Sequence, residues 1–578
     1  MANKNKRLVL WLLGFVVLIS ALTTAGVVLL LDSNPVTLNT EAQTLHLRLR
    51  PGMTEAPGNE GLVMDPAELP PLTSEVSHAI RSAITDDGIS EILVEIDGLN
   101  IGWGQAEEIR SALAEFQASG KACTTWAEGY DIRAYFVSSA CGTIAMTPEG
   151  LPLVNGMNIN QSYYAGALEL LGVQANFEHV GDFKSAVEPY ERNAPSEAAQ
   201  LATNSLLDSL YGSVTASIAT GRNVDIQTIH GLIDDPPITG AKAVERGLID
   251  QRIYRTDLLK QIDDEHGRIK GSTYIGDLRG GWSVGQSITV VHADGPIVSG
   301  RGGSDMFGEN MIGSRGLSNI LKDLTEDDNT AAVVLRVNSP GGSGMASDDI
   351  WNQVLALKAE KPVVVSMGDY AASGGYYISM PADRIVALPT TITGSIGVFG
   401  GKMNLAGLFE KAGVTQFEYS RGARSDLLST VEDFDPEDRA LFRSFLHTFY
   451  DTFLHKAAEG RGMTKEDMHA VAQGRVWTGV QAVENGLVDE LGGLHDAIRI
   501  AAELANISEY KVDRLPERKG FLDQLLDEMA NPDSAAVRVQ IPGLPQQLSG
   551  PIRALFVLEQ VLVDGGVAAM LPGQLDIH

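Results

Sequence analysis

Apolar and polar residues follow two different periods along most of this chain, and these periods predict two kinds of element. Short apolar runs such as 92–96 and 333–337 have the length of buried strands, and longer stretches with helical spacing follow them. Strands and helices alternate in this way in both halves of the chain. The alternation is typical of parallel β–α units, so we expect an α/β protein.

The first thirty residues differ from the rest because they contain a long uncharged run. Leu8–Leu31 has 24 residues without a charge, and Lys4, Lys6 and Arg7 precede it. A helix of this length exceeds a hydrocarbon core of about 30 Å, which predicts a transmembrane anchor with its N-terminus in the cytoplasm. A cleaved signal peptide is the alternative, although the run is too long for a signal core. The rest of the chain then forms one exported body, periplasmic in a Gram-negative cell.

The body repeats itself at an offset of about 240 residues. Seven of the ten positions in 241–250 are identical or nearly so in 480–489. A period this long indicates two domains of one fold and excludes a solenoid. The predicted divisions are a cytoplasmic tip and anchor (1–31), a linker or arm rich in Pro, Thr and Glu (32–75), an N-terminal repeat (76–280), a C-terminal repeat (281–505) and a tail (506–578) whose apolar stretch 552–570 docks on the surface.

Charge and cysteine content narrow the possible functions. The chain carries 74 acidic and 44 basic side chains, a formal charge of −30. Such a surface repels phosphate backbones, so we expect no nucleic-acid partner. Two cysteines, Cys123 and Cys141, are too few for a disulfide scaffold or a cysteine-rich zinc module. We expect two separate buried thiols, although an exported compartment would permit a disulfide.

A glycine pair in the C-terminal repeat is the first candidate site. The strand at 333–337 runs into Asn338–Gly344, which contains Gly341 and Gly342, and a helix is expected over 347–359. Backbone N–H groups at such a turn suit an anion, either a phosphate or a developing oxyanion. No Gly-Lys-Ser/Thr sequence follows, so this turn is not a Walker loop.

Two serines lie in glycine-framed turns farther along the same repeat. Ser373 follows a strand expected at 362–367 and is surrounded by small residues in Ala371–Tyr376. This setting is typical of a nucleophile at a strand-to-helix turn, and an ordinary helix N-cap is the alternative. Ser395, in Thr393–Val398, is the second hydroxyl of this kind.

A serine nucleophile needs a base, and no histidine lies in a motif-like setting. His179 and His292 are nearest to the candidate segments, and we expect both to be surface or core residues. A lysine can take this part if burial keeps its amine neutral. Lys184, in the N-terminal repeat, is the best candidate, and a solvated surface lysine is the alternative.

The repeat offset separates the candidate base from the candidate nucleophile. Lys184 falls opposite Arg424, which cannot act as a neutral base because its pKa exceeds about 12. Ser373 falls opposite Ile132 or Arg133, and neither is a nucleophile. The N-terminal repeat thus lacks the nucleophile, and the C-terminal repeat lacks the neutral base. The sequence predicts one active site assembled from both repeats, in which Lys184 reaches Ser373.

The chain resembles the long, tandem-repeat form of the signal peptide peptidase A family, whose folds are related to those of Clp protease and crotonase. The resemblance extends from the anchor to about residue 505 and rests on the segments 183–189, 338–343, 371–376 and 393–397. It implies two Clp/crotonase-like β–α domains behind a transmembrane helix. In shorter relatives with one repeat, the lysine lies in the stretch where this chain has Arg424.

The resemblance also implies an activity. It implies a membrane-anchored serine endopeptidase that degrades released signal peptides and similar apolar peptides on the periplasmic side of a bacterial inner membrane. No metal or other cofactor is implied, and a homotetramer is expected. The residues to which it assigns roles are Ser373 (nucleophile), Lys184 (general base), Ser395 (orientation of the lysine), and Gly374 with Gly341 or Gly342 (N–H donors to the oxyanion).

Two other functions stay open at this point. A crotonase-like acyl-CoA enzyme could use the glycine turn, but coenzyme A is cytoplasmic and Ser373 would have no use. A non-catalytic membrane scaffold is possible too, but Ser373 and Lys184 are both intact. The sequence leaves open whether these two residues meet within one chain or across a subunit contact.

Overall fold

The computed structural model describes residues 42–57, 71–279, 285–304, 310–516 and 567–570. The expected anchor, Leu8–Leu31, lies outside the described residues. Among the helices that are described, none has the length and apolar character needed to cross a membrane.

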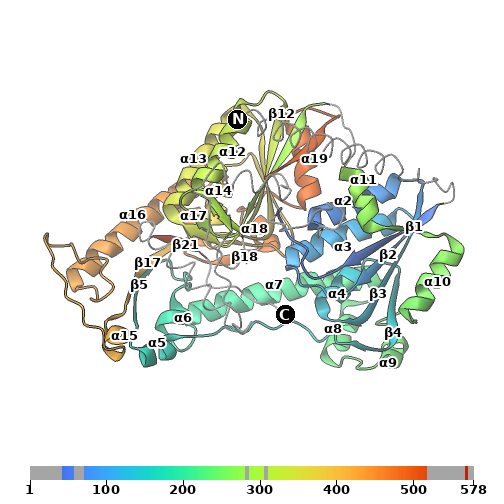
Figure 1. Ribbon diagram of the computed structural model, residues 1–578, viewed down its shortest axis with the longest axis horizontal. Helices are drawn as coiled ribbons and strands as arrows, with labels where there is room; N and C mark the ends of the chain where they lie inside the picture. Colours follow the sequence, from blue (N-terminus) through green and yellow to red (C-terminus); the bar gives the residue numbers. More distant parts are fainter. Residues whose placement is uncertain (1–41, 58–70, 280–284, 305–309, 517–566, 571–578) are drawn as a thin grey trace, which may run out of the picture.

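The N-terminal half is built on a parallel sheet of six strands in the order β6–β4–β3–β2–β1–β7. Figure 1 labels four of these strands, β1 to β4. Its side chains alternate between two apolar layers. Ile92 and Val94 face a core shared with the helices α2 (Thr73–Thr85), α3 (Trp103–Ala118) and α4 (Ile132–Ser138), and Leu93 faces α10 (Arg255–Glu265). The strands are β1 (Gln43–Leu49), β2 (Ile89–Ile96), β3 (Ala122–Tyr130), β4 (Thr143–Pro152), β6 (Gln251–Arg252) and β7 (Arg268–Lys270).

The C-terminal half repeats this plan. Its main sheet contains a parallel series in the order β19–β15–β14–β12–β8–β20, which matches the first sheet strand for strand. Two further strands, β16 and β18, extend the path beyond β14. The bounds are β8 (Ser287–Asp294), β12 (Thr330–Ser339), β14 (Val363–Ala372), β15 (Arg384–Ala387), β16 (Ile392–Gly394), β18 (Val476–Thr478), β19 (Glu490–Leu491) and β20 (Lys511–Leu515).

The helices repeat as well. The long helices α7 (Glu197–Arg222) and α16 (Pro436–Arg461) both have 26 residues, and both end in a left-handed residue. The similar segments of the sequence form α9 (Gly240–Glu245) and α18 (Gly479–Glu484). The duplication expected from the sequence is therefore present in the fold.

Two expected divisions of the chain need correction. The linker or arm at 32–75 contains β1, an internal strand of the first sheet, and the start of α2. The alternation of Leu45, Leu47 and Leu49 builds this strand, but it is short and lies in a stretch with the composition of a linker. The expected tail likewise contributes β20 to the second sheet, where it is an edge strand with half-buried side chains.

A third sheet joins pieces from both halves in the order β10–β11–β9–β13–β21–β17–β5. Here β5 of the N-terminal half pairs antiparallel with β17 of the C-terminal half over seven residues, from Val180 opposite Val398 to Gln174 opposite Asn404. The bounds are β5 (Gln174–Val180), β9 (Ile297–Val298), β10 (Gly302–Ser304), β11 (Asn310–Gly313), β13 (Gly341–Ser343), β17 (Val398–Asn404) and β21 (Ala568–Met570).

A buried ion network fixes the N-terminal half against the second sheet. The Arg336 guanidinium on β12 donates to Glu55 at 2.5 Å and to Glu108 of α3 at 2.9 Å. Asp369 on β14 accepts from the backbone N–H of Gln105 at 3.1 Å, in the first turn of α3. The first half therefore docks directly behind the strand that leads to Ser373.

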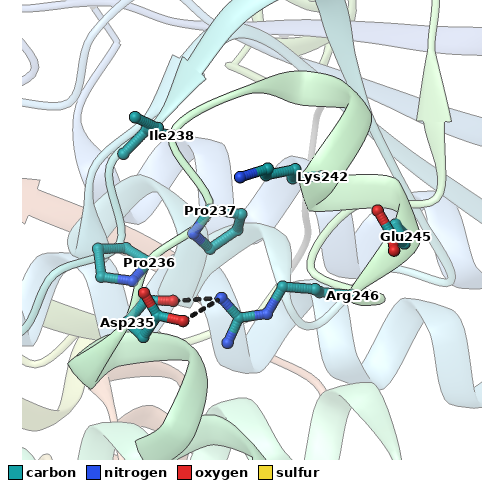
Figure 2. A pocket seen from close by; sticks show the side chains of 7 residues that line it. All are labelled: Asp235, Pro236, Pro237, Ile238, Lys242, Glu245 and Arg246. Atoms are coloured by element: carbon teal, nitrogen blue, oxygen red, sulfur yellow. Dashed lines mark hydrogen bonds and ion pairs between the residues drawn. The ribbon is translucent and has the colours of Figure 1, made fainter.

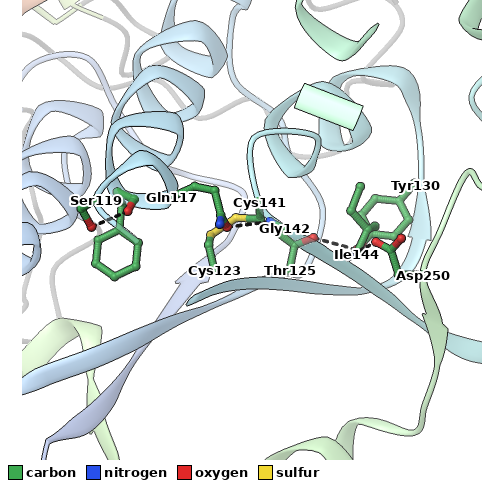
Figure 3. The surroundings of a disulfide bond; sticks show 10 residues. Gln117, Ser119, Cys123, Thr125, Tyr130, Cys141, Gly142, Ile144 and Asp250 are labelled. Atoms are coloured by element: carbon green, nitrogen blue, oxygen red, sulfur yellow. Dashed lines mark hydrogen bonds between the residues drawn. A yellow bond between two sulfur atoms is a disulfide. The ribbon is translucent and has the colours of Figure 1, made fainter. Parts of the chain in front are cut away.

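The two cysteines form a disulfide between Cys123 on β3 and Cys141, which follows α4 (Figure 3). This corrects the expectation of two separate thiols. The crossover from β3 through α4 returns the chain beside its own starting strand, with Cα atoms 4.8 Å apart. Sequence spacing alone does not show that a short crossover brings these residues together.

The ion network yields a stability prediction. We expect Arg336→Met to destabilise the protein by about 3–5 kcal/mol, because it leaves Glu55 and Glu108 buried without their cation. The matched control is Arg499→Met, which removes a half-exposed arginine paired with Glu503 and should cost about 0–1 kcal/mol. Urea denaturation followed by circular dichroism measures both. Equal denaturation midpoints for the two variants would contradict this account of the interface.

Candidate active site

Ser373 lies where β14 ends and α14 (Gly374–Ser379) begins, as the sequence predicts. Its φ of 57° is in the left-handed region, which a serine rarely adopts and which costs about 1–3 kcal/mol. Its backbone N–H donates to the carbonyl of Gly394 at 2.8 Å, which helps to hold this conformation. The strained turn places the hydroxyl in the interior of the protein, where it is fully buried.

Lys184 reaches this hydroxyl from the other half of the chain. It lies in the loop that follows β5, so the β5–β17 ladder brings it to the C-terminal half. Its Nζ lies 2.8 Å from Ser373 Oγ, 3.0 Å from Ser395 Oγ and 3.1 Å from the carbonyl oxygen of Ser395. The sequence left open whether the lysine and serine meet within one chain, and here they do.

Burial determines the charge state of this lysine. Its residue surface is only 1% exposed, and loss of hydration lowers the pKa of Lys184 well below its ordinary value of 10.5. A neutral amine has two N–H donors and one lone pair. If both N–H groups bond to the oxygens of Ser395, the lone pair remains for the proton of Ser373. All three contacts can therefore be kept in the neutral form.

Ser395 follows β16 in a second strained turn, with a φ of 51°. Its N–H donates to the carbonyl of Arg475 at 2.7 Å, so the turn is fixed from behind while its hydroxyl and carbonyl face Lys184. The structure thus brings together Ser373, Lys184 and Ser395, the three side chains expected at the site.

The glycine turn lies beside the nucleophile. A Cβ on Gly374 would lie 2.6 Å from Ser347 Oγ and 3.1 Å from the nitrogen of Gly342, so only glycine permits this approach. The N–H of Gly341 already donates to Ser339 Oγ at 3.2 Å. Of the two glycines that the sequence left open, Gly342 is therefore the better partner for Gly374 in holding an oxyanion.

Sequence reasoning missed the segment that supports the lysine loop, Gln473–Arg475. The carbonyl of Gln473 accepts from the N–H of Phe183 at 2.9 Å, and the Arg475 guanidinium lies 5.2 Å from the ring centre of Phe183. A Cβ on Gly474 would lie 2.6 Å from the Cα of Lys184. Only a bare backbone fits there. The glycine at 474 was the sole signal in the sequence, and one glycine does not indicate a contact 290 residues away.

The two histidines and Arg424, the repeat counterpart of Lys184, have ordinary structural surroundings. His292 is buried, and burial lowers its pKa to about 3, whereas the His179 ring nitrogen lies 3.3 Å from the carbonyl of Gly181. Arg424 pairs with Glu437 at 2.6 Å on the surface.

The structure corrects the expected counterpart of Ser373. Ile132 and Arg133 lie inside α4, and the residue that precedes this helix, as Ser373 precedes α14, is Asp131. The Asp131 side chain caps the helix by accepting from the N–H of Ala134 at 2.7 Å, with an unstrained φ of −85°.

A pocket of about 560 Å³ lies away from these residues, in the N-terminal half (Figure 2). It is lined by Asp235–Ile238, Lys242, Glu245 and Arg246, and the last of these pairs with Asp235. By the repeat offset, Asp235–Ile238 corresponds to residues 474–477 of the C-terminal half. Those residues overlap Gln473–Arg475, the segment that supports the Lys184 loop.

Comparisons with known proteins identify relatives of this chain. "Serine protease SPPA, chloroplastic" of Arabidopsis thaliana is 31% identical over 513 residues, 86% of this chain and 74% of that protein. "Protease 4" of Salmonella typhi is 33% identical over 486 residues, 81% of this chain and 77% of that protein. Among solved structures, a ClpP1 mutant from Listeria monocytogenes covers 36% of this chain and 94% of its own at 17% identity, with a TM-score of 0.23, too slight to carry an argument.

The family model named Peptidase family S49 matches the chain twice, at residues 115–268 and 355–508, once in each half. This match, with the two relatives, makes the protein a serine peptidase and sets aside the acyl-CoA enzyme and the scaffold. The chain belongs to peptidase family S49.

Proposed function

We propose that this S49 peptidase is a membrane-anchored endopeptidase with a Ser373–Lys184 dyad, and that it degrades released signal peptides and similar apolar peptides. The observation that carries the proposal is the 2.8 Å contact between Lys184 Nζ and Ser373 Oγ, both of which are buried. A buried lysine whose amine is neutral can accept a proton, whereas a solvated lysine at neutral pH cannot.

In the first step, Lys184 accepts the proton of Ser373, and the serine oxygen attacks the carbonyl carbon of the peptide. Ser395 keeps the amine oriented, since its two oxygens accept the N–H groups that do not face the nucleophile. The N–H groups of Gly374 and Gly342 stabilise the oxyanion, and one such donor contributes about 2.7–4 kcal/mol in other serine proteases.

In the second step, the protonated Lys184 donates its proton to the leaving amine as the C–N bond breaks. The acyl group remains on Ser373 Oγ. A water molecule that is activated by the neutral amine then attacks the ester, and the serine recovers its proton. One residue thus acts as base and acid in turn, without a histidine.

The surroundings of the dyad favour apolar peptides. The sheet beside the serine is packed with buried apolar side chains, among them Phe177 on β5, Phe399 on β17 and Val298 on β9. Signal peptides are rich in Leu, Ala and Val, which suits apolar surroundings of this kind. A further relative, 36% identical over 223 residues, which are 38% of this chain and 65% of that protein, is named "Putative signal peptide peptidase SppA" from Enterococcus faecium.

The proposed location is the inner membrane of a bacterium, with the catalytic body in the periplasm. Leu8–Leu31 supplies a single span, and the basic residues before it keep the N-terminus inside. The Cys123–Cys141 disulfide supports an exported body, because such bonds form and persist in oxidising compartments.

The repeat also supports assembly into a homo-oligomer. The family resemblance implies that this oligomer is a homotetramer. Residues 414–420 are the counterpart of β5, and Phe417 and Glu418 match Phe177 and Glu178 of that strand. Among the described strands, however, none pairs with 414–420, and Phe417 and Tyr419 are 80% and 89% exposed. We propose that this segment pairs with the residues before α5 (Ala165–Leu171) of the next copy, as β5 pairs with β17 within the chain.

The pocket in Figure 2 fits the same arrangement. Arg421–Arg424 follows 414–420, as Gly181–Lys184 follows β5. If the contact between copies repeats the one within the chain, this basic segment lies against Asp235–Ile238 of the next copy. Those pocket residues are the counterpart of 474–477. The exposed Asp235 and Glu245 there offer carboxylates to the arginines. Such a head-to-tail contact builds rings when its rotation closes.

The first test of the function is hydrolysis of a fluorogenic Leu- and Ala-rich peptide by the full-length protein in detergent. Ser373→Ala and Lys184→Ala should each lower kcat/KM by about 10³-fold or more, and Lys184→Arg should be as inactive because arginine stays charged. The matched controls are Ser425→Ala and Lys358→Ala, which should retain activity. A version of the peptide with acidic residues should be cut more slowly. Full activity in Lys184→Ala would exclude the dyad.

The charge of Lys184 predicts the pH dependence. Below the lowered pKa the amine is protonated and cannot accept the serine proton, so kcat/KM should rise with pH and level off well below pH 10.5. The unfolded chain binds this proton up to the ordinary pKa, so the free energy of unfolding should also rise with pH across that window. Lys184→Met should lose this pH-dependent part of the stability. A kcat/KM that falls between pH 6 and 9 would contradict a neutral lysine.

Assembly is tested by light scattering of the full-length protein in detergent. The double variant Phe417→Asp, Tyr419→Asp should shift the mass toward that of a single chain, because two carboxylates cannot be buried between copies. Tyr254→Asp, at another exposed aromatic residue, is the control and should leave the mass unchanged. If the double variant keeps the wild-type mass, the copies do not meet through residues 414–420.

A further inference from the structure

The strand that leads to the nucleophile, β14, contains a bulge. It pairs with β12 in regular register as far as Val337, which lies opposite Met367. The next pair joins Ser339 to Ala371, so one residue of β12 lies opposite three residues of β14, 368–370. A bulge bends its strand and re-aims the side chains beyond it, and bulges are common next to active sites. Here the bulge comes directly before the nucleophile turn.

The bulge is also the point at which β14 exchanges one neighbour for another. Before it, residues 364–367 pair with β15, and after it residues 370–372 pair with β16. The pairing with β16 continues into the turn, where the N–H of Ser373 donates to the carbonyl of Gly394 at 2.8 Å. The conformation of the bulge therefore sets how β14 meets β16, and with it the position of the Ser373 hydroxyl.

Hydrogen bonds at three points hold the bulge. Asn338 Oδ1 accepts from the N–H of Tyr370 at 3.1 Å. The hydroxyl of Thr391 donates to the carbonyl of Gly368 at 2.7 Å. Both of these contacts lie within the second half. The third is made by the middle residue of the bulge, Asp369, whose buried carboxylate reaches the first half.

The Asp369 carboxylate lies against the N-terminus of α3. Its Oδ1 accepts from the N–H of Gln105 at 3.1 Å, and the N–H of Gly104 bonds to the carboxylate as well. A carboxylate at this place satisfies free N–H groups and faces the positive end of the helix dipole. A Cβ on Gly102 would lie 2.0 Å from the carboxylate carbon, although the φ of −71° at this residue suits any amino acid. The glycine is therefore needed to make room for Asp369.

By the repeat offset, this helix start is the counterpart of the oxyanion turn. Residues 100–102 correspond to 341–343, and α3 corresponds to α13 (Gly344–Glu360). The first half has Asn-Ile-Gly where the second has Gly-Gly-Ser, but its N–H groups still bind an anion, and that anion belongs to the second half. The copy of the turn without a nucleophile thus holds the strand that carries the nucleophile.

We propose that Asp369 is a positioning residue: its carboxylate, held by α3, fixes the bulge that aims the Ser373 hydroxyl at Lys184. The first half then supplies both the base and the position of the nucleophile. The proposal rests on the function proposed above, in which Ser373 attacks the peptide. The hydrogen-bond partners of the carboxylate lie on α3, outside the dyad and the glycine turn, so the expected effect is on kcat and not on KM.

The first experiment compares two carboxylates that dock the same helix on the second half. In Asp369→Asn, an amide replaces the acceptor that faces α3. We expect kcat for the fluorogenic peptide to fall about 10²-fold, as for a displacement of about 1 Å, with KM unchanged. The midpoint of the rise with pH should stay that of the wild type, because Lys184 remains buried. An unchanged kcat in Asp369→Asn would overturn the proposal.

The matched control is Glu108→Gln. Its carboxylate, also on α3, accepts from Arg336 at 2.9 Å and from the N–H of Leu494 at 2.7 Å, away from the bulge. This variant weakens the docking of α3 but should keep the wild-type kcat, and urea denaturation shows that both variants are folded. If Glu108→Gln loses as much kcat as Asp369→Asn, the loss comes from looser docking in general and Asp369 has no positioning role.

The second experiment approaches the carboxylate from the first half, and it also serves if Asp369→Asn does not fold. Gly102→Ala should displace the carboxylate and lower kcat about tenfold. In an Asp369→Ala background the added methyl group meets no carboxylate, so Gly102→Ala should then have no further effect. Gly212→Ala, at a glycine of α7 where a Cβ meets nothing within 4 Å, is the control. Two effects that simply multiply in the double variant would overturn the proposal.

A third measurement separates this proposal from the proposed function. A fluorophosphonate labels an active serine without a peptide substrate, and Asp369→Asn should be labelled about 10²-fold more slowly than the wild type. If the wild type is neither labelled nor active, the proposed function fails and the positioning role fails with it. If both proteins are labelled at the same rate, only the positioning role fails. Amide hydrogen exchange of residues 368–376 should be faster in Asp369→Asn and not in Glu108→Gln, whether or not the peptide is cut.

Discussion

One amino group that must stay uncharged governs the arrangement of this protein. In the proposed mechanism, Lys184 accepts a proton only while its amine is neutral, and burial favours that state by lowering its pKa. Each unit of lowering costs about 1.36 kcal/mol of folding free energy at a pH below the lowered pKa. The surrounding structure has to outweigh this cost. It does so with a seven-residue ladder between β5 and β17, and with the bare backbone of Gly474 against the lysine Cα. The base is therefore positioned by main chain more than by side chains.

The duplication explains why the base can come from a distant segment. Both halves have the same strand order, so each offers the same turn after its third strand and the same loop before its long helix. In the first half the turn carries Asp131, an unstrained helix cap, and in the second it carries the strained Ser373. In the second half the loop carries Arg424, paired on the surface, and in the first it carries the buried Lys184. The strained serine and the buried amine each occur in only one half, and these two residues are the ones that meet.

Much of this could be read from the sequence because it depends on local pattern. Apolar runs located β2, β12 and β14, and small residues around Ser373 located the turn. The repeat offset indicated that the lysine of one half and the serine of the other belong to one site. What the sequence could not show was non-local. Nothing in it indicates that Gln473–Arg475 supports Lys184, or that Cys123 and Cys141 end side by side, because these contacts depend on how crossovers return in space.

The errors at the ends of the repeats have a related cause. The strands β1 and β20 were assigned to a linker and a tail because their flanking residues have the composition of such segments. Each is nevertheless required by the topology, since β1 completes the first sheet beside β2 and β20 extends the second beside β8. Matching the two halves strand by strand would have revealed them, because a repeat that lacks a strand present in its twin leaves a sheet edge unpaired.

The third sheet shows why the site cannot be assigned to either half alone. Its strands β13 and β17 come from the second half, and β21 from the C-terminal end lies between them. Its edge strand β5 comes from the first half and leads into the loop that carries Lys184. The seven-residue ladder between β5 and β17 holds the loop of Lys184 against the second half. Lys184 Nζ comes within 2.8 Å of Ser373 Oγ because both halves contribute strands to this one sheet. Neither half contains both members of this contact.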